Sequence, residues 1–282
     1  MSKKSVFLSI IVPVFNRENY IGRCLKSVFE AARRVNFSVE LVVIDDGSTD
    51  GSVRVIESLF EEFRRHSLPN FMFRLIVLDE NHGVNFARNR GIEIADSEFT
   101  IFLDSDNYFF EDAFLKVWRW INKISADLYL FSTVSASTGK VMDKVFPKNR
   151  NVTYHEYLCH FSGELTTVIR TDILKKYPLF EKINGGEGVY WTLLLKKGFK
   201  AYLVDDVIKI YDETPPNRLS SRKKNFRRLA KVYGFYLKYL LLEYLLHCPV
   251  KAFLVVSKFV FYSVFQIVFS IGSFMKKGSN HA

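Results

Sequence analysis

Two short stretches of the sequence place aspartates directly after apolar runs. Residues 42–52 read VVIDDGSTDGS and residues 102–107 read FLDSDN, so Asp45 and Asp46 are matched further along by Asp104 and Asp106. Asp, Ser, Thr and Gly also form ordinary turns and helix caps, so the first stretch alone has two interpretations. Two aspartates one residue apart, however, can direct both carboxylates toward one point beyond a strand end. Because Mg²⁺ and Mn²⁺ take oxygen ligands and share them with phosphates, the sequence predicts a divalent-cation site for a phosphate-bearing substrate.

Motifs for other kinds of phosphate and metal chemistry are missing from the sequence. There is no G-x-G-x-x-G and no G-K-[ST], which argues against a nicotinamide site and against a P-loop. No cluster of His or Cys offers ligands to a softer metal. We therefore expect a diphosphate to be neutralised mainly by a metal ion and by arginine.

The N-terminal part of the chain alternates between apolar runs of strand length and amphipathic runs of helical spacing. Strict alternation of strand and helix predicts parallel pairing through right-handed crossovers. The expected fold class is α/β, with a doubly wound, mostly parallel sheet covered on both faces. Ligands of such sheets bind beyond the carboxyl ends of the strands, where the paired aspartates would lie. The predicted strands are 6–15, 39–45, 73–79 and 99–104, and the predicted helices are 18–34, 51–65 and 83–95.

Residues 1–17, MSKKSVFLSIIVPVFNR, begin like a signal peptide, with two lysines before an apolar run. The run is interrupted by Pro13, Asn16 and Arg17, and it offers no small-x-small cleavage site. We therefore interpret it as the first buried strand.

Beyond residue 110 the alternation is less regular. We expect a helix at 113–124, a hairpin formed by 127–134 and 139–146, a strand at 164–170 and a helix at 188–198. Cys24, Cys159 and Cys248 are odd in number and widely scattered. They suggest neither a metal site nor a disulfide framework, and so favour a reducing compartment.

The C-terminal region differs from the rest in charge. Between Glu213 and Glu243 there is no acidic residue, whereas arginines and lysines recur from Arg218 to Lys238. Such a block attracts polyanions, and the aromatic helices predicted at 232–246 and 252–275 favour an anionic membrane surface as the partner. We expect no nucleic-acid partner, because no recognised binding motif or base-stacking module is present.

A polar stripe runs along the last predicted helix, which at 24 residues is long enough to cross a bilayer. Three alternatives remain open: a hairpin packed on the domain, a helix lying on a membrane surface, and a spanning or re-entrant helix. The stripe consists of Lys251, Lys258, Tyr262, Gln266, Ser273 and Lys277.

Four motifs, taken in order, resemble glycosyltransferase family 2 on a GT-A fold, over roughly residues 6 to 212. The resemblance implies transfer of a sugar from a nucleoside-diphosphate sugar to an acceptor hydroxyl, with inversion at the anomeric carbon. We expect the transferred sugar to be a hexose. It implies a catalytic domain at 1–212, followed by a basic, aromatic helical region at 213–282 for membrane association. The motifs are SIIVPVFNRENYIGRCLKSV, ELVVIDDGSTDGS, ENHGVNFARNRGIEIADSEFTIFLDSDN and GGEGVYW.

The resemblance also assigns roles to individual residues. Asp45 and Asp46 would read the base and ribose of the nucleotide, beneath a loop shaped by Pro13 and Asn16. Arg88 would contact the nucleotide. Asp104, Ser105 and Asp106 form the D-x-D element, in which Asp104 and Ser105 would bind the sugar nucleotide. Asp104 and Asp106 would hold Mn²⁺ or Mg²⁺, with Asp106 the more direct ligand.

The general base is less well defined by the resemblance. The family commonly uses the aspartate of a Glu-Asp pair, but this sequence reads Gly186-Glu187-Gly188, so the second acid is missing. Glu187 is therefore the predicted catalytic base, with Asp212 and Glu164 as the next residues to test. Relatives often carry a basic or His-containing loop that covers the diphosphate, a role open here to Arg218 and Ser220.

The sequence thus predicts an inverting, metal-dependent glycosyltransferase, with UDP-sugars favoured as donors. Its acceptor would be a glycan that is lipid-linked or resembles lipopolysaccharide or capsule, at the cytoplasmic side of the cell membrane, where the protein would be peripheral or monotopic. The alternative, motivated by Gly188, is a catalytically inactive scaffold or sensor that binds sugar nucleotides.

Overall fold

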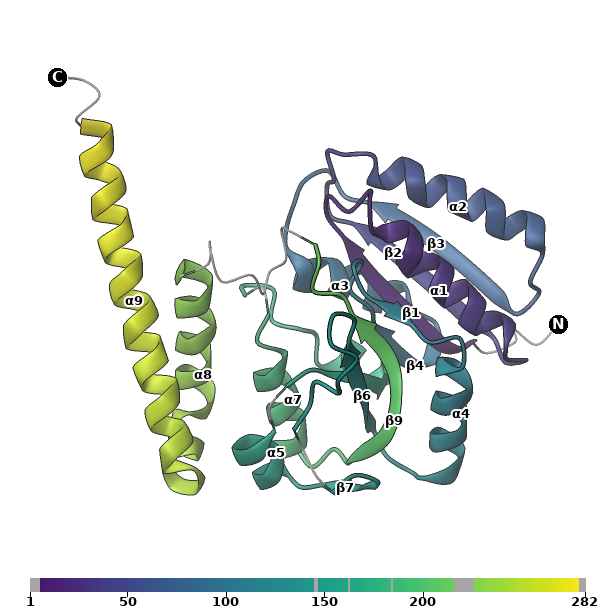
Figure 1. Cartoon of the computed structure of the whole chain (residues 1–282). Coiled ribbons are helices and arrows are strands. Elements are labelled where there is room, and N and C mark those ends of the chain that lie inside the picture. The colour runs from purple at the N-terminus through teal and green to yellow at the C-terminus, as the bar shows by residue number, and fades with distance from the viewer. Residues whose placement is uncertain (1–5, 145–146, 162, 184, 216–225, 279–282) are drawn as a thin grey trace.

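The computed structural model describes residues 6–144, 147–161, 163–183, 185–215 and 226–278. A mixed β-sheet runs through the main body of the protein, and two long helices stand to one side of it (Figure 1). The strands follow the order β3-β2-β1-β4-β8-β6-β9-β5, and β7 pairs with β9. The α/β class expected from the sequence is confirmed.

The first half of the sheet is parallel and positions the paired aspartates. Val14 of β1 lies beside Asp45 of β2, and Ile11 of β1 lies beside Phe102 of β4, so the carboxyl ends of these strands meet at one edge. Asp46 is the first residue after β2, and Asp104 is the second residue after β4. The strands are β1 (Val6–Val14), β2 (Val39–Asp45), β3 (Phe71–Val77) and β4 (Ser97–Phe102).

Helices cover both faces of this half, which explains why its central strands are apolar on both sides. Successive residues of β1 point to opposite faces: Ile10 and Val12 belong to one core cluster and Ile11 to the other. Val6–Val14 is therefore a buried central strand, as expected. One face packs against α1 (Ile21–Arg33), α2 (Ser52–His66) and α4 (Ala113–Lys123), and the other against α3 (Val84–Ile94), α6 (Thr171–Lys176) and α7 (Glu187–Lys196).

The second half of the sheet mixes strand directions and corrects one prediction. β6 pairs with β8 in antiparallel and with β9 in parallel orientation, so both of its edges are occupied. The hairpin predicted from 127–134 and 139–146 forms only at its tip: Val134 and Val141 make an antiparallel bridge, and the N–H groups of Ser135 and Met142 donate to the carbonyls of Lys140 and Thr133 at 3.0 and 2.9 Å. Over Leu128–Ser132 the edge of β6 that a longer hairpin would need is occupied by β8. Residues 145 and 146 lie outside the described part. The strands are β5 (Tyr108–Phe109), β6 (Leu128–Ser135), β7 (Arg150–Val152), β8 (Leu165–Arg170) and β9 (Ala201–Tyr211).

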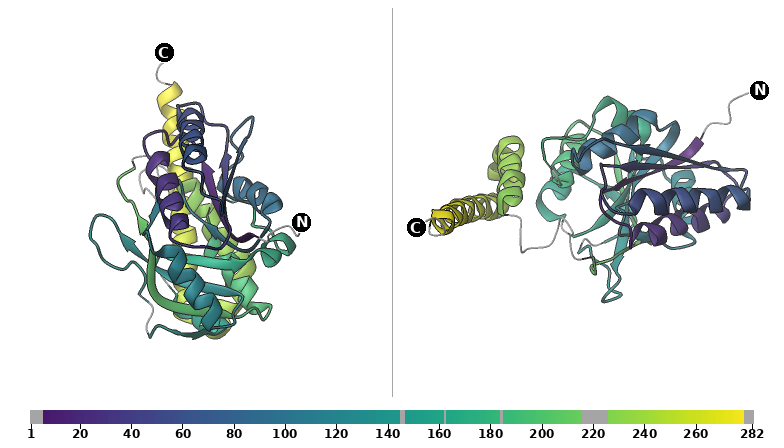
Figure 2. Two further views of the ribbon diagram at one scale, coloured as in Figure 1. Left: turned by 90° about the vertical axis from the view of Figure 1, so that its right-hand side faces the viewer. Right: turned by 90° about the horizontal axis from the view of Figure 1, so that it is seen from above.

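The C-terminal helices α8 (Phe226–His247) and α9 (Pro249–Gly278) form a helical hairpin beside the sheet domain. In both Figure 1 and the view from above in Figure 2, α8 lies nearer the sheet domain and α9 lies outside it. Leu240 and Tyr244 of α8 pack with Leu158 of α5 (Tyr154–His160) and Val189 of α7 in a small core cluster. Among the described residues, we find no helix whose length and apolarity would suffice to cross a bilayer.

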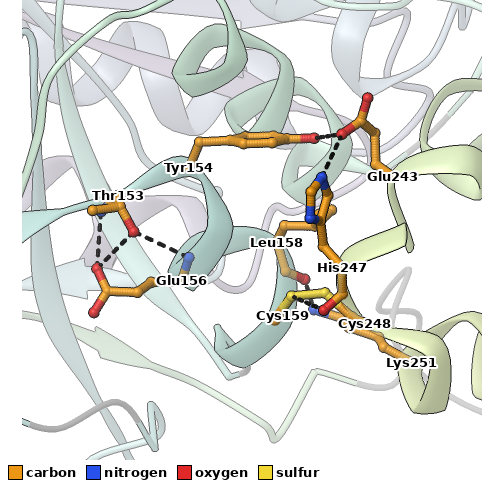
Figure 3. Close-up of a disulfide and its surroundings, with 9 residues drawn as sticks. All are labelled: Thr153, Tyr154, Glu156, Leu158, Cys159, Glu243, His247, Cys248 and Lys251. Carbon is orange, nitrogen blue, oxygen red and sulfur yellow. Dashed lines mark hydrogen bonds and ion pairs between the residues drawn. A yellow bond between two sulfur atoms is a disulfide. The ribbon is translucent and has the colours of Figure 1, made fainter. Parts of the chain in front are cut away.

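A disulfide between Cys159 and Cys248 ties α5 to the junction of α8 and α9 (Figure 3). The expectation that the cysteines form no disulfide was wrong. The two residues are 89 positions apart, and only the packing of the hairpin on α5 brings their Cα atoms to 5.6 Å. Around the bond, the Tyr154 hydroxyl donates to Glu243 at 2.8 Å, and the Lys251 ammonium donates to the carbonyl of Leu158. Cys24 is buried and remains a free thiol.

Candidate active site

A cleft of about 940 Å³ opens at the carboxyl ends of β1, β2 and β4. Its volume falls in the range usual for small-molecule sites. The cleft continues past α7 to α8, so the N-terminal sheet and the C-terminal helix share it. Of the residues predicted to carry function, those that line it are Pro13, Asn16, Asp46, Arg88, Asp104, Ser105, Asp106 and Glu187.

Asp46 anchors the loop that follows β3. Its carboxylate accepts hydrogen bonds from the backbone N–H groups of His82 at 2.9 Å and Gly83 at 2.8 Å, and from the side chain of Asn81 at 2.9 Å. Gly47 adopts φ +73°, and a Cβ there would lie 2.6 Å from the backbone of Glu80. The Asp46 carboxylate therefore has two roles: it lines the cleft, and it fixes the conformation of the neighbouring loop by hydrogen bonding.

Asp45 lies beneath the cleft and is fully buried. One carboxylate oxygen accepts the N–H of Ser48 at 2.9 Å, and within the described residues the other has no hydrogen-bond partner. A buried carboxylate oxygen without a partner is unfavourable unless a ligand or water supplies a donor. Asn16, at φ +53°, joins the loop after β1 to the same segment by accepting the N–H of Thr49 at 2.8 Å.

Arg88 connects the two halves of the site. It projects from α3 with only 8% of its side chain exposed. One guanidinium nitrogen donates to Asp104 at 2.8 Å and the other to Glu187 at 2.6 Å. The Cζ of Arg88 also lies 5.2 Å from the centroid of the Phe102 ring. The predicted metal ligand and the predicted base are therefore held by a single buried cation.

These ion pairs govern the charge state of the site. Desolvation raises the pKa of Asp104, but neighbouring cations, Arg88 foremost, outweigh it and hold that pKa below its ordinary value. Burial lowers the pKa of Arg88, and the charges of Asp104 and Glu187 more than reverse this, so that its pKa is raised. Both groups are therefore charged at neutral pH.

Asp104 and Asp106 are suited to a divalent cation in a phosphate site. Both line the cleft, and the Asp106 carboxylate lies 3.8 Å from the Nε of Arg17. Among the described residues no group of three His, Cys, Asp or Glu side chains is placed to hold a metal. Mg²⁺ in phosphate sites typically takes one or two carboxylates and completes its shell with phosphates and water, so two aspartates fit such an ion.

The structure gives a physical reason for glycine at position 188. A Cβ on Gly188 would lie 2.6 Å from the hydroxyl oxygen of Tyr236 on α8. The space that a side chain at 188 would occupy is therefore taken by a residue of the C-terminal helix. Burial and the charge of Glu187 raise the pKa of Tyr236 to about 12, so its hydroxyl keeps its proton at neutral pH.

The two alternative bases lie in different places. Asp212 forms an ion pair with Arg23 and does not line the cleft. Glu164 does line it and pairs with Lys209 at 2.9 Å. Arg218 and Ser220, suggested as residues that cover the diphosphate, lie outside the described part of the chain.

Sequence reasoning missed several residues of the cleft wall. Lys209 interrupts an apolar strand in the run DVIKIY and is buried, which is a signal that could have found it. The neighbouring Asp104 and Glu164 outweigh the effect of burial and raise its pKa. Arg228 and Tyr236 come from α8 and carried no signal, since they reach the cleft only through tertiary packing.

Comparison with known proteins places this chain in a family. A family model described as glycosyl transferase family 2 matches residues 9–171, more than half of the 282 residues. The matched stretch contains the residues predicted to bind the sugar nucleotide and ends before Glu187.

Two relatives and one solved structure are representative. A Bacillus subtilis protein, TuaG, described as a teichuronic acid biosynthesis glycosyltransferase, is 27% identical over 225 residues, covering 79% of this chain and 85% of that protein. The GalNAc(5)-diNAcBac-PP-undecaprenol beta-1,3-glucosyltransferase of Campylobacter jejuni is 26% identical over 211 residues, covering 72% of this chain and 64% of that protein. The structure of S. aureus TarS 1-349 in complex with UDP-GlcNAc has a TM-score of 0.62 at 21% identity, covering 90% of this chain and 72% of that one. This likeness confirms a GT-A type fold.

Proposed function

This chain belongs to glycosyl transferase family 2, and from that premise we propose that it transfers a hexose from a UDP-sugar to a hydroxyl of a glycan acceptor, with inversion at the anomeric carbon. Family membership makes it a glycosyltransferase that acts on a nucleotide sugar. The sugar, the acceptor, the metal and the site of action are our proposals.

The observation that carries the proposal is the chain of contacts from Asp104 through Arg88 to Glu187. Transfer with inversion in one displacement needs a base at the acceptor hydroxyl and positive charge at the leaving diphosphate. Arg88 supplies fixed positive charge between the two carboxylates. Its ion pair also orients Glu187 by holding Oε1, while the Glu187 side chain remains 36% exposed and can accept the proton of the hydroxyl.

The donor would lie along the strand ends. Asp46 and Asn16 line the cleft and flank the place of the nucleoside, and Asp45, buried beneath them, supports the adjoining loop by accepting the N–H of Ser48. Asp104 and Asp106 would hold Mn²⁺ or Mg²⁺, which when bound would neutralise the charge that develops on the diphosphate. Ser105, buried between the two aspartates, would contact the sugar nucleotide.

The acceptor we propose is a lipid-linked or cell-surface glycan. The names of the two relatives refer to teichuronic acid biosynthesis and to a glycan on a polyprenyl diphosphate. A basic, aromatic C-terminal region suits an acceptor that is presented at a membrane.

We further propose that the helical hairpin lies on the anionic surface of the cell membrane, on its cytoplasmic side. Large apolar side chains of α8 and α9 face solvent: Leu242 and Leu246 are each 67% exposed, Phe253 is 72% and Val250 is 73% exposed. Several large exposed apolar side chains on one pair of helices are typical of an interaction site. Exposed Lys231 and Lys258 add the positive charge that attracts anionic lipid.

The cytoplasmic location has a consequence for the disulfide. Disulfides in the cytoplasm are rare and usually transient. At that location we therefore expect Cys159 and Cys248 to be reduced, and their contact to rest on the packing of Leu158, Leu240 and Tyr244. Differential alkylation of thiols in freshly lysed cells, read by mass spectrometry, would show whether the pair is reduced.

A screen of nucleotide sugars by thermal shift, with and without Mn²⁺, tests the donor proposal. A ligand at 100 times its Kd stabilises the folded state by about 2.7 kcal/mol. We expect one UDP-sugar to raise the Tm with Mn²⁺ and to lose this effect in Asp106→Ala. If no nucleotide or nucleotide sugar raises the Tm, the donor proposal is wrong. Donor binding with neither transfer nor hydrolysis would instead favour an inactive scaffold.

A further inference from the structure

The cleft does not end at the donor residues but extends along one face of α8. Arg228, Val232, Tyr236 and Tyr244 line it, and the fully buried Leu240 completes the series. These residues are four positions apart, so they form one stripe on the helix. The stripe faces α7 and α5, and the Cys159–Cys248 disulfide fastens the C-terminal end of α8 to α5. One wall of the cleft is therefore built by the C-terminal helix.

Arg228 is the cation on this wall whose charge is not balanced by a partner. Its Nε is buried without a hydrogen-bond acceptor, and within the described residues its guanidinium forms no ion pair. Glu187, the carboxylate that influences it, is already bound to Arg88 at 2.6 Å. A buried guanidinium N–H without an acceptor is unfavourable, and the partial burial of Arg228 lowers its pKa. The site is thus suited to an anion supplied by a ligand.

The position of Arg228 separates it from the donor residues. The guanidinium comes within 3.9 Å of the place where a Cβ on Gly185 would lie, just before α7. Figures 1 and 2 show α7 between α8 and the parallel strands whose ends carry Asp46 and Asp104. Glu187 lies at the start of α7 and is the proposed base, so it must face the acceptor hydroxyl. Arg228 lies on the far side of Glu187 from the donor residues, and therefore on the acceptor side of the cleft.

We propose that Arg228 binds a phosphate group of the acceptor, which makes the acceptor of this enzyme a phosphate-bearing glycan or glycan precursor. Arginine suits this role because its guanidinium can bind phosphate through two parallel hydrogen bonds. The assignment of this phosphate to the acceptor, rather than to the donor, rests on the proposed function. Val232 and Tyr236 would form the adjoining wall, against which the remainder of the acceptor packs.

Calorimetric titration with sn-glycerol 3-phosphate, in the presence of saturating UDP and Mn²⁺, tests the proposal. UDP occupies the nucleotide site, so the probe reports on the rest of the cleft. We expect the wild-type protein to bind the phosphate probe and not glycerol. Arg228→Gln should weaken that binding roughly 10- to 100-fold, as expected for loss of hydrogen bonds to a charged group. Arg228→Lys should retain part of it, because the charge remains but the fork geometry is lost.

Two controls make the result specific. Lys231→Gln removes an equal charge from an exposed position on the same helix. It should leave the affinities for sn-glycerol 3-phosphate and for UDP unchanged. The thermal unfolding of Arg228→Gln, compared with that of the wild type, shows whether the variant is folded.

Equal affinity of wild type and Arg228→Gln for the phosphate probe would overturn the proposal. Weakened binding of UDP by Arg228→Gln would also overturn it, because the guanidinium would then serve the donor diphosphate. Failure of the wild type to bind UDP or any nucleotide sugar would count against the proposed function. In that case the titration without UDP still decides whether Arg228 forms a phosphate site.

Discussion

Arg88 is the residue on which the site depends most. It is buried, and it forms ion pairs with Asp104 on one side and Glu187 on the other. Both carboxylates raise the pKa of Arg88 and so stabilise its charged form. A buried arginine that loses one carboxylate partner leaves an uncompensated charge, so substitutions at either carboxylate affect geometry as well as chemistry. Variants that preserve shape and hydrogen bonding are therefore the informative ones at this site.

Glu187→Gln is the most informative variant for catalysis. The amide can still accept the hydrogen bond from Arg88 but cannot take the proton of the acceptor hydroxyl. We expect donor affinity to be retained and turnover to fall ~10²–10⁴-fold, the usual contribution of a general base. Steady-state kinetics and a donor-binding isotherm on the same preparation measure the two effects separately.

Glu164→Gln provides the matched control for this prediction. Glu164 lines the same cleft and is paired with Lys209 instead of Arg88. Its substitution should affect turnover far less. If the large loss appears in Glu164→Gln and turnover of Glu187→Gln falls less than about threefold, the base has been assigned to the wrong glutamate.

At the scale of elements, α7 and α8 are fitted to each other at Gly188 and Tyr236. Gly188→Ala would bring a methyl group 2.6 Å from the tyrosine hydroxyl, whereas the next ring atom lies 3.8 Å away, at an ordinary contact distance. In the wild type we expect a loss of roughly 1–3 kcal/mol from this overpacking. In Tyr236→Phe the same alanine should be neutral or stabilising by up to about 1 kcal/mol, because alanine favours a helix over glycine.

A double-mutant cycle by urea denaturation measures this coupling. The contact predicts that the effect of Gly188→Ala depends on the residue at 236. An identical change in unfolding free energy in both backgrounds would mean that the two helices do not meet at these residues.

The disulfide between α5 and the hairpin gives a second prediction about elements. Cys248→Ser removes a cross-link between residues 89 positions apart, which should reduce the free energy of unfolding by roughly 2–5 kcal/mol in oxidising buffer. In reducing buffer the variant and the wild type should differ little. Denaturation curves under both conditions are the measurement. Equal stability of the two proteins in oxidising buffer would show that the bond does not form or does not stabilise.

The elements that sequence could predict are those whose pattern is local. The strands that end at Asp45 and near Asp104 could be predicted because uninterrupted apolar runs are typical of parallel strands buried on both faces. The hairpin predicted at 127–134 and 139–146 is confined to its tip for the opposite reason. Its pattern resembled two paired strands, but β8 and β9, which come later in the chain, occupy both edges of β6 over Leu128–Ser132.

The same distinction holds within the site. Asp46, Asp104 and Asp106 follow strand ends and could be placed from their motifs. Tyr236 and Arg228 could not be placed in this way, because they lie on α8 and reach the cleft only through the packing of that helix on the sheet domain. The Cys159–Cys248 bond was missed for the same reason, since sequence spacing does not show which distant segments pack together.

For the whole molecule, the principal question is what the exposed apolar side of the hairpin contacts. The double variant Leu246→Ser and Phe253→Ser removes two exposed side chains from α8 and α9. Burial of a large apolar side chain contributes about 1.5–3 kcal/mol, so we expect binding to anionic vesicles to fall at least about tenfold. High salt should weaken binding further by screening the basic residues, without abolishing the apolar part.

Flotation with phosphatidylglycerol-containing liposomes measures this binding. Val77→Ser, which alters an apolar residue 52% exposed on β3, is the control and should bind as the wild type does. Equal flotation of the double variant and the wild type would show that the hairpin surface does not contact lipid.

The central claim, that this chain transfers a sugar from a nucleotide to an acceptor, is tested most directly by product formation. The purified full chain is incubated with the UDP-sugar selected by thermal shift, Mn²⁺ and a lipid-linked glycan extract, and the products are followed by mass spectrometry. We predict release of UDP together with an acceptor species heavier by one hexose residue, both lost in Asp106→Asn. Release of UDP without a heavier acceptor, or full transfer by Asp106→Asn, would contradict the account.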